Sequence, residues 1–485
     1  MTGITAFGAY IPRLRLQRKA IVEANSWFNP GLKGLAKGER SICNWDEDTM
    51  TMAVEASRDC LGTDGPPENL GAVFMASTSM PYADRQNAGV LATALGCSED
   101  MMTMDVTSSQ RAGTTGLINA LNSVAGQGGT ALLAAAEKRR TKTAGTQELT
   151  YGDGAAAVLL GKDNLIAEMV GAHQVSVDFV DHYRGANEEF DYNWEERWIR
   201  DEGYLKIAPR ALEGLFKKTG VAAGDVNHFV MPCLIRNVPA MLAKKAGIPD
   251  GAVRDNLQAV MGEAGTAHTL VMLVDALQDA KPGDLIVVLG WGQGCDAVMF
   301  KATDAIAGAR KNMGVKGFLA RRKEESNYNK YLSFNNLVTQ DMGLRSEADK
   351  QTALTALYRK KDQILAMVGG KCRVCGTVQF PKSNICVNPN CGEFHSQDDH
   401  PFADIPAKVQ SWTADNLTFT PDPPQHFGMV TFEEGGRLMA DFTDVDVGKV
   451  ESGMPIRMVF RVKEYDPQRG FTKYFWKAAP AYEAS

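Results

Sequence analysis

The sequence predicts a mixed α/β protein that ends in a small β-barrel, on three observations. Short apolar runs alternate with helical stretches over residues 1–303. A charged, helical stretch without an apolar strand run follows over residues 304–370. Residues 371–485 contain four clustered cysteines and then segments in which apolar and polar residues alternate. The length of 485 residues agrees with several domains of about 150 residues each.

Composition and charge exclude several classes of protein. Hydrophobic residues make up 44% of the chain and charged residues 23%, which excludes a disordered protein. The net charge of −6 argues against a dedicated nucleic-acid binder. No stretch approaches the roughly 20 apolar residues that span a membrane, and the N-terminus lacks an export pattern. Five of the nine cysteines are scattered singly, as in a reducing compartment, so we expect a cytoplasmic protein without membrane or nucleic-acid partners.

Three apolar runs in the first segment predict buried strands of a sheet covered by helices on both faces. They are Leu132–Ala136, Ala155–Leu160 and Leu285–Leu289. Runs that stay apolar on both alternating sides are typical of the central strands of α/β proteins.

An internal repeat divides this first segment into two halves, about 1–165 and 166–303. The tripeptide AGT opens a helical stretch at Ala112–Thr114 and again at Ala264–Thr266, and each helix leads through a glycine turn into an apolar strand. Two copies of one strand–helix–strand unit predict a core with pseudo-twofold symmetry. Because a helix N-terminus carries unpaired N–H groups and partial positive charge, we expect the chemistry just before these two helices.

Seven motifs occur in order along the first 303 residues. They are GAYIPRLRL, DEDTMTMAVEA, STSMPYADRQNAG, RAGTTGLINAL, YGDGAAAVLLG, AKPGDLIVVL and GWGQGCDA. This set resembles the thiolase superfamily, most closely the 3-hydroxy-3-methylglutaryl-CoA synthase branch and then ketoacyl-ACP synthase III. The resemblance implies a five-layer αβαβα core, an acyl-CoA substrate and a homodimer paired through an edge strand.

The family's four catalytic positions carry different residues in this chain. The nucleophilic cysteine of the family aligns with Gln110, and its histidine aligns with Pro232. The glutamate of the synthase branch aligns with Thr78, and the asparagine of the ketoacyl synthases aligns with Glu263. Because an amide cannot be acylated, the covalent step of the family is in question.

Two ionisable groups that the family does not have lie in the same region as these four positions. Glu263 begins the second buried helix, and His268 lies five residues further along. Such a pair could move a proton, while the Gln110 amide polarises a thioester oxygen. We therefore predict a CoA-dependent enzyme that cleaves an activated carbon–carbon bond without an acyl-enzyme, by retro-aldol, retro-Claisen or decarboxylation chemistry.

Two other interpretations stay open at this point. Ser109 or Cys233, each one residue from a family catalytic position, could be the nucleophile of a condensation or thiolysis. In the other interpretation, Gln110 only fills the space of a lost cysteine in a non-catalytic scaffold that binds acyl-CoA. His268 has an alternative of its own, as a hydrogen-bonded core histidine.

Substrate contacts are expected from three regions. Thr78 stands in one of the altered family positions. The aromatic and charged segment Asp181–Lys206 matches an insertion that shapes the substrate pocket in the related synthases. Its candidate pocket residues are Tyr183, Arg184, Tyr192 and Tyr204. Basic residues in regions comparable to the CoA-binding mouth of the relatives are Lys37, Arg40, Arg236 and Lys244.

The cysteine cluster predicts a structural zinc site. Two short pairs, Cys372-x2-Cys375 and Cys386-x4-Cys391, are separated by ten residues. Each pair can present two sulfurs to one tetrahedral ion, and four thiolates leave no open position for catalysis. The helix before this site is expected to run from Ser346 to Met367 and to end at the following glycine pair.

The last part of the chain predicts a zinc ribbon over residues 371–395 and an OB-fold over residues 396–485. Alternation in Gly428–Thr431, Arg437–Phe442 and Ile456–Tyr465 is typical of half-buried antiparallel strands. A ribbon followed by such a barrel resembles an acyl-CoA-associated family whose members usually work as separate subunits beside thiolase-like enzymes. The acidic barrel argues against nucleic acid, so we expect a lid or docking platform over the acyl-CoA tunnel.

Overall fold

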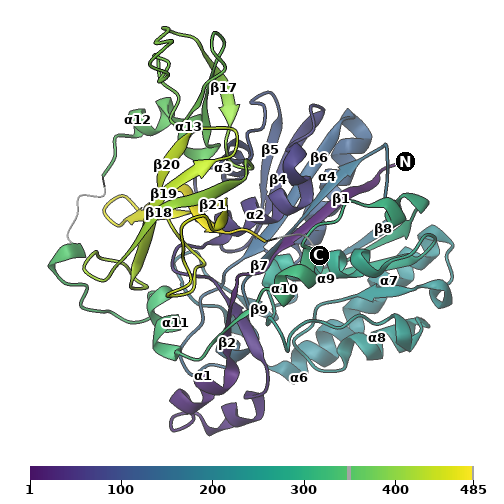
Figure 1. The fold of residues 1–485 in the computed structure, drawn as a ribbon. Coiled ribbons are helices and arrows are strands. Elements are labelled where there is room, and N and C mark those ends of the chain that lie inside the picture. Colours follow the sequence, from purple (N-terminus) through teal and green to yellow (C-terminus); the bar gives the residue numbers. More distant parts are fainter. Residues whose placement is uncertain (347–350, 483–485) are drawn as a thin grey trace.

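The computed structural model describes residues 1–346 and 351–482 of the chain (Figure 1). A sheet of nine strands forms the core, in the order β11-β12-β13-β8-β1-β7-β6-β4-β5. The first half of the internal repeat contributes the strands β1 (Gly3–Tyr10), β7 (Gly154–Gly161), β6 (Thr130–Glu137), β4 (Leu70–Ala76) and β5 (Met102–Val106). The second half of the repeat contributes β8 (Ala167–Ser176), β13 (Gly294–Ala302), β12 (Leu285–Trp291) and β11 (His228–Val230).

The two halves repeat one topology, as the sequence predicts. Strands β1 and β8 meet only at their ends, where Gly3 and Ile4 pair with Glu168 and Ala167. From β1 outward the neighbours are antiparallel, antiparallel and then parallel, and from β8 outward the same sequence of pairings returns. All three predicted apolar runs lie within strands of this sheet, namely β6, β7 and β12.

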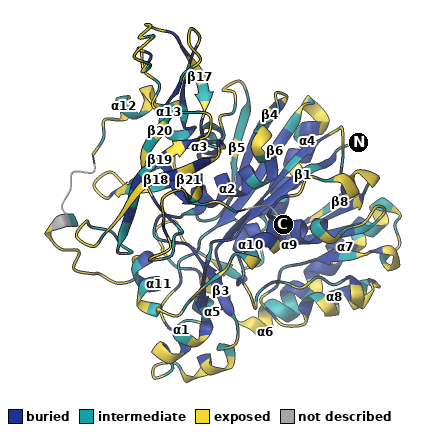
Figure 2. Cartoon of the chain, viewed as in Figure 1, coloured by how far each residue is buried: buried dark blue, intermediate teal, exposed yellow. Residues whose placement is uncertain are grey.

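The two predicted helices occupy the centre of the core. Helix α4 (Ala112–Gln127) and helix α9 (Gly265–Asp279) pack against each other, and each contacts strands of both halves. Gly113 permits this approach, since a Cβ at that position would collide with the carbonyl oxygen of Thr266. Almost the whole of α9 is buried, as Figure 2 shows.

Outer helices complete the five layers. Helix α2 (Thr49–Leu61) covers β1, β6 and β7, and helix α3 (Asn87–Ala94) covers β4 and β5. Helix α7 (Leu205–Thr219) covers β8 and β13 and packs against α8 (Val238–Ala246). The shorter elements of the core are α1 (Arg18–Asn25), α5 (Gln147–Thr150), β9 (His182–Tyr183), β10 (Tyr192–Asn193), α6 (Glu196–Trp198) and the π-helix η3 (Ile199–Tyr204).

The connector differs from the prediction in two ways. Its first part belongs to the core, because α10 (Gly314–Ala320) packs on β1 and α9. It also contains a strand that the sequence did not reveal, β14 (Lys323–Glu325), which pairs with β2 (Leu14–Gln17) beside β3 (Glu39–Ile42). Helix α11 (Tyr328–Phe334) follows.

The prediction of a single helix from Ser346 to Met367 is also wrong for the part of this segment that the structure describes. Two short helices, α12 (Leu354–Arg359) and α13 (Lys361–Leu365), stand there instead, and residues 347–350 lie outside the described part. The glycine pair that was expected to end the helix lies inside strand β15 (Val368–Cys372), where its backbone pairs with β17.

The C-terminal part has the predicted ribbon and barrel, but the ribbon sheet reaches beyond the predicted bounds 371–395, because it includes β15 from Val368 and a strand that ends at Pro401. The ribbon sheet has the order β16-β15-β17, with β16 at Val378–Gln379 and β17 at Gln397–Pro401. The barrel has the order β20-β19-β18-β21-β22. Its strands are β18 (Ala407–Asp415), β19 (Gln425–Phe432), β20 (Arg437–Asp441), β21 (Pro455–Asp466) and β22 (Phe471–Pro480). No helix among the described residues has the length and apolar character that crossing a membrane requires.

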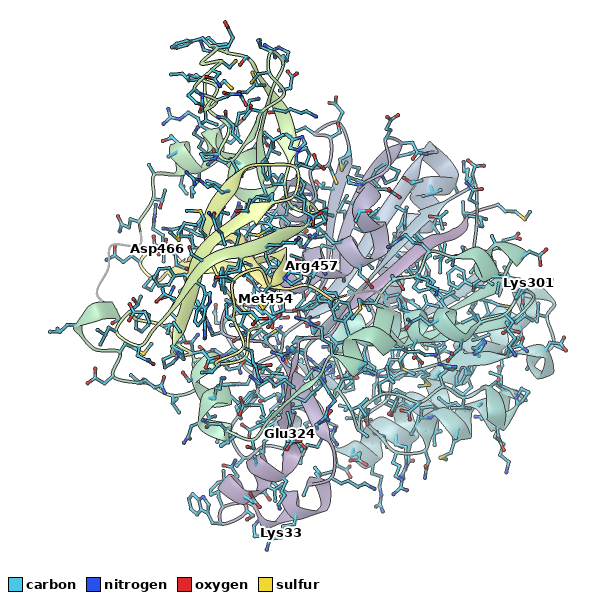
Figure 3. The ribbon with its side chains drawn as sticks, in the orientation of Figure 1. Lys33, Lys301, Glu324, Met454, Arg457 and Asp466 are labelled. Carbon is cyan, nitrogen blue, oxygen red and sulfur yellow. The ribbon has the colours of Figure 1, made fainter. Side chains whose placement is uncertain are left out.

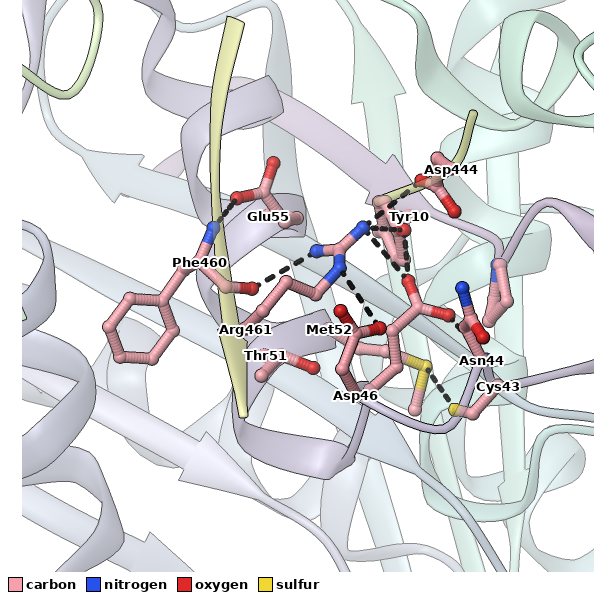
Figure 4. Close-up of polar contacts among 12 residues, drawn as sticks. Tyr10, Cys43, Asn44, Asp46, Thr51, Met52, Glu55, Asp444, Phe460 and Arg461 are labelled. Carbon is pink, nitrogen blue, oxygen red and sulfur yellow. Dashed lines mark hydrogen bonds and ion pairs between the residues drawn. The ribbon is translucent and has the colours of Figure 1, made fainter. Parts of the chain in front are cut away.

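Buried charges join the barrel to the core. Figure 4 shows Arg461 of β21 facing Tyr10 and Asp444. The Arg461 guanidinium donates to the Tyr10 hydroxyl at 2.9 Å and lies 3.1 Å from the Glu47 carboxylate and 3.2 Å from that of Asp444. Figure 3 shows Arg457 at the same junction, and its guanidinium lies 3.3 Å from the Glu55 carboxylate of α2. The barrel is therefore fixed on the outer face of α2.

Candidate active site

A cavity of about 350 Å³ lies where the N-termini of the two central helices face each other. Among the residues that the structure describes, only residues of the core line it, so the barrel of the same chain contributes nothing to its wall. The expected lid is therefore not part of this cavity, and a role of the barrel as a docking platform stays a prediction. Chemically active side chains on the lining are Gln110, Arg139, Asp181, His182, Cys233 and Glu263.

Gln110 lies at the entry to helix α4, after a turn in which Ser108 has a positive φ of 71°. The buried Oε1 of Gln110 has no hydrogen-bond donor among the described residues. The side chain fits beside α9 because Gly265, with φ 49°, has no Cβ, and a Cβ there would stand 2.7 Å from Oε1. The amide therefore reaches the floor of the cavity with hydrogen-bonding capacity unused.

Glu263 lies just before α9 and is ion-paired with Arg139, which extends from the end of β6. Arg139 also stacks over the Tyr151 ring at 3.5 Å and lies 3.6 Å from the Asp191 carboxylate. Burial raises the pKa of Glu263, but the Arg139 guanidinium, together with the nearby His268 and His182, outweighs burial, so the pKa lies below its ordinary value. Glu263 is thus a paired carboxylate and a weak base.

His268 does not serve as the expected partner of Glu263. Its Nδ1 accepts the Ala264 N–H at 3.0 Å, and its Nε2 lies 2.7 Å from the Asn256 carbonyl oxygen. The ring is fully buried and is not part of the cavity lining. Burial lowers the pKa of His268 further. The alternative of a hydrogen-bonded core histidine describes this residue, because neither ring nitrogen is left for a substrate.

Neither of the two alternative nucleophiles has an activating base beside it among the residues that the structure describes. Ser109 donates its hydroxyl to the Gly292 carbonyl at 2.9 Å and is not among the lining residues. Cys233 does line the cavity, but burial raises the pKa of its thiol to about 12. A thiol with that pKa is protonated at neutral pH and is a poor nucleophile.

Glu137, which the sequence analysis missed, is the hydrogen-bond partner that holds Thr78 in the core. This fully buried carboxylate accepts hydrogen bonds from the Thr78 hydroxyl at 3.0 Å and the Thr78 N–H at 3.1 Å. It also accepts from Ser77, Ser79 and the N–H of Thr266. Thr78 therefore holds the core together instead of contacting the cavity, contrary to the expectation.

The segment Asp181–Lys206 supplies one of the four predicted pocket residues. Tyr204 lines the cavity and packs on Trp291 with ring centroids 4.3 Å apart. Tyr183 and Tyr192 are exposed and pair with each other at 5.5 Å, outside the lining. Arg184 is held by the Asp191 carboxylate at 2.7 Å, also outside the lining.

Of the four predicted CoA contacts, the structure contradicts one and finds the other three exposed. Arg40 is buried and donates to the Glu148 carbonyl at 2.7 Å, so it cannot reach a nucleotide. Lys37, Arg236 and Lys244 are exposed. Leu35 and Ile235, which line the cavity, lie within two residues of Lys37 and Arg236 in sequence.

An aspartate–histidine pair on the cavity wall is the main feature that the sequence analysis missed. Asp181 Oδ1 lies 3.0 Å from His182 Nδ1, and Asp181 Oδ2 accepts the indole N–H of Trp291 at 2.8 Å. Burial lowers the pKa of His182, but the hydrogen bond to Asp181 and the negative charge of that carboxylate together outweigh burial, so the pKa is raised. The adjacent Asp–His dipeptide was the only local signal, in a segment rich in other charges.

The four clustered cysteines converge as metal ligands do. The sulfurs of Cys372, Cys375, Cys386 and Cys391 all lie within 4.8 Å of one another. The Cys375–Cys386 and Cys372–Cys391 sulfur pairs are 3.5 and 3.9 Å apart. A tetrahedral zinc with bonds of about 2.3 Å requires about 3.8 Å between sulfurs, so the donor set fits this ion.

Comparisons with known proteins agree with this architecture. A family model described as the C-terminal OB-fold domain of ChsH2 matches residues 401–461. The hydroxymethylglutaryl-CoA synthase of Aeropyrum pernix is 30% identical over 335 residues, covering 68% of this chain and 92% of the relative. That of Caldivirga maquilingensis is 29% identical over 344 residues, covering 69% and 98%.

Solved structures share the thiolase-like fold of the core. MvaS in complex with 3-hydroxy-3-methylglutaryl coenzyme A superposes with a TM-score of 0.57 at 18% identity, covering 82% of this chain and 99% of MvaS. The 3-oxoacyl-[acyl-carrier-protein] synthase III of Aquifex aeolicus superposes with a TM-score of 0.54 at 19% identity, covering 62% and 100%.

Proposed function

Because the chain belongs to the hydroxymethylglutaryl-CoA synthase family and is a thiolase-like enzyme, we propose that its substrate is an acyl-CoA and that it cleaves the carbon–carbon bond next to the thioester carbonyl without an acyl-enzyme. The substrate class is a β-hydroxyacyl- or β-ketoacyl-CoA. A β-hydroxyacyl thioester is favoured, because the ligand named with MvaS is of this class.

One observation carries the proposal. Gln110 lines the cavity at the entry of α4, and its side-chain N–H₂ has no hydrogen-bond acceptor recorded among the described residues. By the resemblance, this is the position at which the relatives keep their nucleophile. The amide N–H₂ can donate to the thioester oxygen as charge develops there, and such donors typically contribute about 10²- to 10³-fold in rate. The fixed Glu263–Arg139 pair forms the polar wall opposite.

Retro-aldol cleavage balances without another reactant. A base removes the proton of the β-hydroxyl, the bond between C2 and C3 breaks, and C3 becomes a carbonyl carbon. The electron pair passes to C2 and the thioester oxygen as an enolate, which Gln110 stabilises. Protonation of C2 then gives the shortened acyl-CoA.

The test is product analysis with the purified protein. We expect a β-hydroxyacyl-CoA to give a shorter acyl-CoA and a free carbonyl compound in equal amounts, separated by liquid chromatography. Cys233→Ala retains this activity, and Gln110→Ala loses about 100-fold or more. Absence of cleavage with both β-hydroxyacyl- and β-ketoacyl-CoA would overturn the proposal.

Condensation is the second candidate, and the names of the relatives favour it. In that reaction Ser109 or Cys233 would carry an acyl group, and the product would be longer than either substrate. Loss of activity in Cys233→Ala or Ser109→Ala, with formation of a longer acyl-CoA, would support condensation. A catalytically silent scaffold would turn over neither kind of substrate.

We further infer that the ribbon holds a structural zinc and that the protein is a homodimer. The ion would cross-link the two cysteine pairs, and none of these cysteines lines the cavity. Strand β5 supports the dimer, since it is an edge of the core sheet. Lys37, Arg236 and Lys244 remain the proposed contacts of the CoA phosphates.

A further inference from the structure

The cleavage proposed above requires a base, and most titratable groups of the cavity are unsuited to that task. Burial raises the pKa of both Tyr151 and Cys233 to about 12, and it also raises the pKa of Tyr204. All three stay protonated at neutral pH. Glu263 is ionised but ion-paired with Arg139.

His182 has the geometry that these groups lack. Its Nδ1 faces the Asp181 carboxylate at 3.0 Å, and its side chain lines the cavity. No hydrogen-bond partner is recorded for its Nε2 within the described part of the chain. The carboxylate therefore favours the tautomer with hydrogen on Nδ1, which leaves the lone pair on Nε2 for a substrate proton.

We propose that His182 is the catalytic proton carrier of the carbon–carbon bond cleavage and that Asp181 is its positioning residue. The assignment rests on the function proposed above. His182 Nε2 takes the proton of the β-hydroxyl as the bond between C2 and C3 breaks. The imidazolium then returns this proton to C2 of the enolate, so that the ring ends each cycle neutral.

The surroundings favour a proton held transiently on this ring. Asp181 is joined to it directly, while Arg139, Asp191 and Glu263 act on it through space. Asp181 is the main stabiliser of the imidazolium, because Glu263 is already paired with Arg139, and Asp191 with both Arg139 and Arg184. Trp291 fixes the far oxygen of Asp181 at 2.8 Å and thereby sets the angle at which the imidazole enters the cavity.

The inference predicts a specific dependence on pH. Cleavage requires neutral His182, so kcat/KM should rise with pH through an acid limb above the ordinary histidine value, because the pKa of His182 is raised. Asp181→Asn removes the main cause of that shift and should move the limb to lower pH. A merely structural aspartate would lower activity without moving the limb.

The experiment compares His182→Gln, Asp181→Asn and His228→Gln with the wild type on one β-hydroxyacyl-CoA between pH 5 and pH 9. His182→Gln should lose about 100- to 1,000-fold in kcat, lose the acid limb and keep KM within about threefold, as is usual for the loss of a general base. His228→Gln is the matched control. His228 also pairs with an aspartate, Asp284 at 3.0 Å, but lies on β11 outside the cavity lining, and it should keep wild-type kinetics.

The outcomes separate the two proposals. If the wild type cleaves and His182→Gln cleaves equally well, or retains the acid limb, the role of His182 is overturned while the proposed function stands. If the wild type cleaves no substrate, the proposed function fails and this inference fails with it. Unchanged far-ultraviolet circular dichroism and melting temperature in His182→Gln show that any loss of activity is not a loss of fold.

Discussion

Arg461 carries a buried positive charge from the barrel into the core, and its removal should loosen the whole junction. Its side chain is 1% exposed and faces Glu47 at 3.1 Å and Asp444 at 3.2 Å. Arg461→Met keeps about the same volume but leaves the Glu47 carboxylate without this cation, whereas Asp444 keeps Arg321 at 2.9 Å. Removing one partner of a buried ion pair typically costs about 3–5 kcal/mol.

That magnitude is measurable by calorimetry. With a shift of about 2–4 °C per kcal/mol, the first melting transition of Arg461→Met should fall by about 6–20 °C. Limited proteolysis should then release the barrel from the core. Arg457→Met is the matched control on the same strand, because Arg457 is 26% exposed and its partner Glu55 keeps Arg58, so we expect a loss of about 1 kcal/mol or less.

A second substitution distinguishes charge from packing. Arg461→Met combined with Glu47→Gln removes the stranded Glu47 carboxylate and should recover part of the lost stability. A melting temperature of Arg461→Met within 2 °C of the wild type would refute the reasoning that this network holds the barrel. So would an equal loss in the Arg457→Met control.

Three further outcomes are expected. Gly113→Ala should destabilise the core by about 1–3 kcal/mol in calorimetry, because its Cβ meets the Thr266 carbonyl, whereas Gly126→Ala on the same helix has open space and should not. Cys375→Ser should lower bound zinc, measured by metal analysis, and loosen the ribbon without changing the far-ultraviolet spectrum of the core. Hydrogen bonding from Arg13 lowers the pKa of Asp446 to about 2, so this contact stabilises the fold above the unfolded pKa of about 4 and is lost as pH falls toward 2. In acid titrations followed by tryptophan fluorescence, Asp446→Asn should lose that part of the pH dependence, and an unchanged profile would contradict the assignment.

The fold could be predicted because its signals are local. The AGT tripeptides mark the entries of α4 and α9, and apolar runs mark the central strands. The cysteine pairs are likewise legible from spacing alone, and the structure brings their sulfurs together. Local pattern is weakest in the connector, where short charged helices and the strand β14 carry no distinct periodicity.

The site was predicted only in part, because its chemistry depends on distant partners. Gln110 and Glu263 do meet in one cavity, as their places before the two helices imply. Arg139, which neutralises Glu263, lies 124 residues away in sequence, and no local pattern announces it.

The same reason explains the errors. The proton-carrying role expected of His268 fails because the carbonyl of Asn256, from a preceding loop, already occupies its Nε2. His182 was overlooked because its partner network includes Trp291, which lies 110 residues from Asp181 in sequence. Arg40 looks like a surface cation in the sequence, but the fold encloses it beside Tyr331.

Non-covalent cleavage at Gln110 is tested most directly by intact-protein mass spectrometry on samples quenched in acid during turnover of a β-hydroxyacyl-CoA. We expect only the unmodified mass at every time point while the shorter acyl-CoA accumulates. An acyl adduct that forms and decays at the rate of turnover, on Ser109, Cys233 or any other side chain, would contradict this.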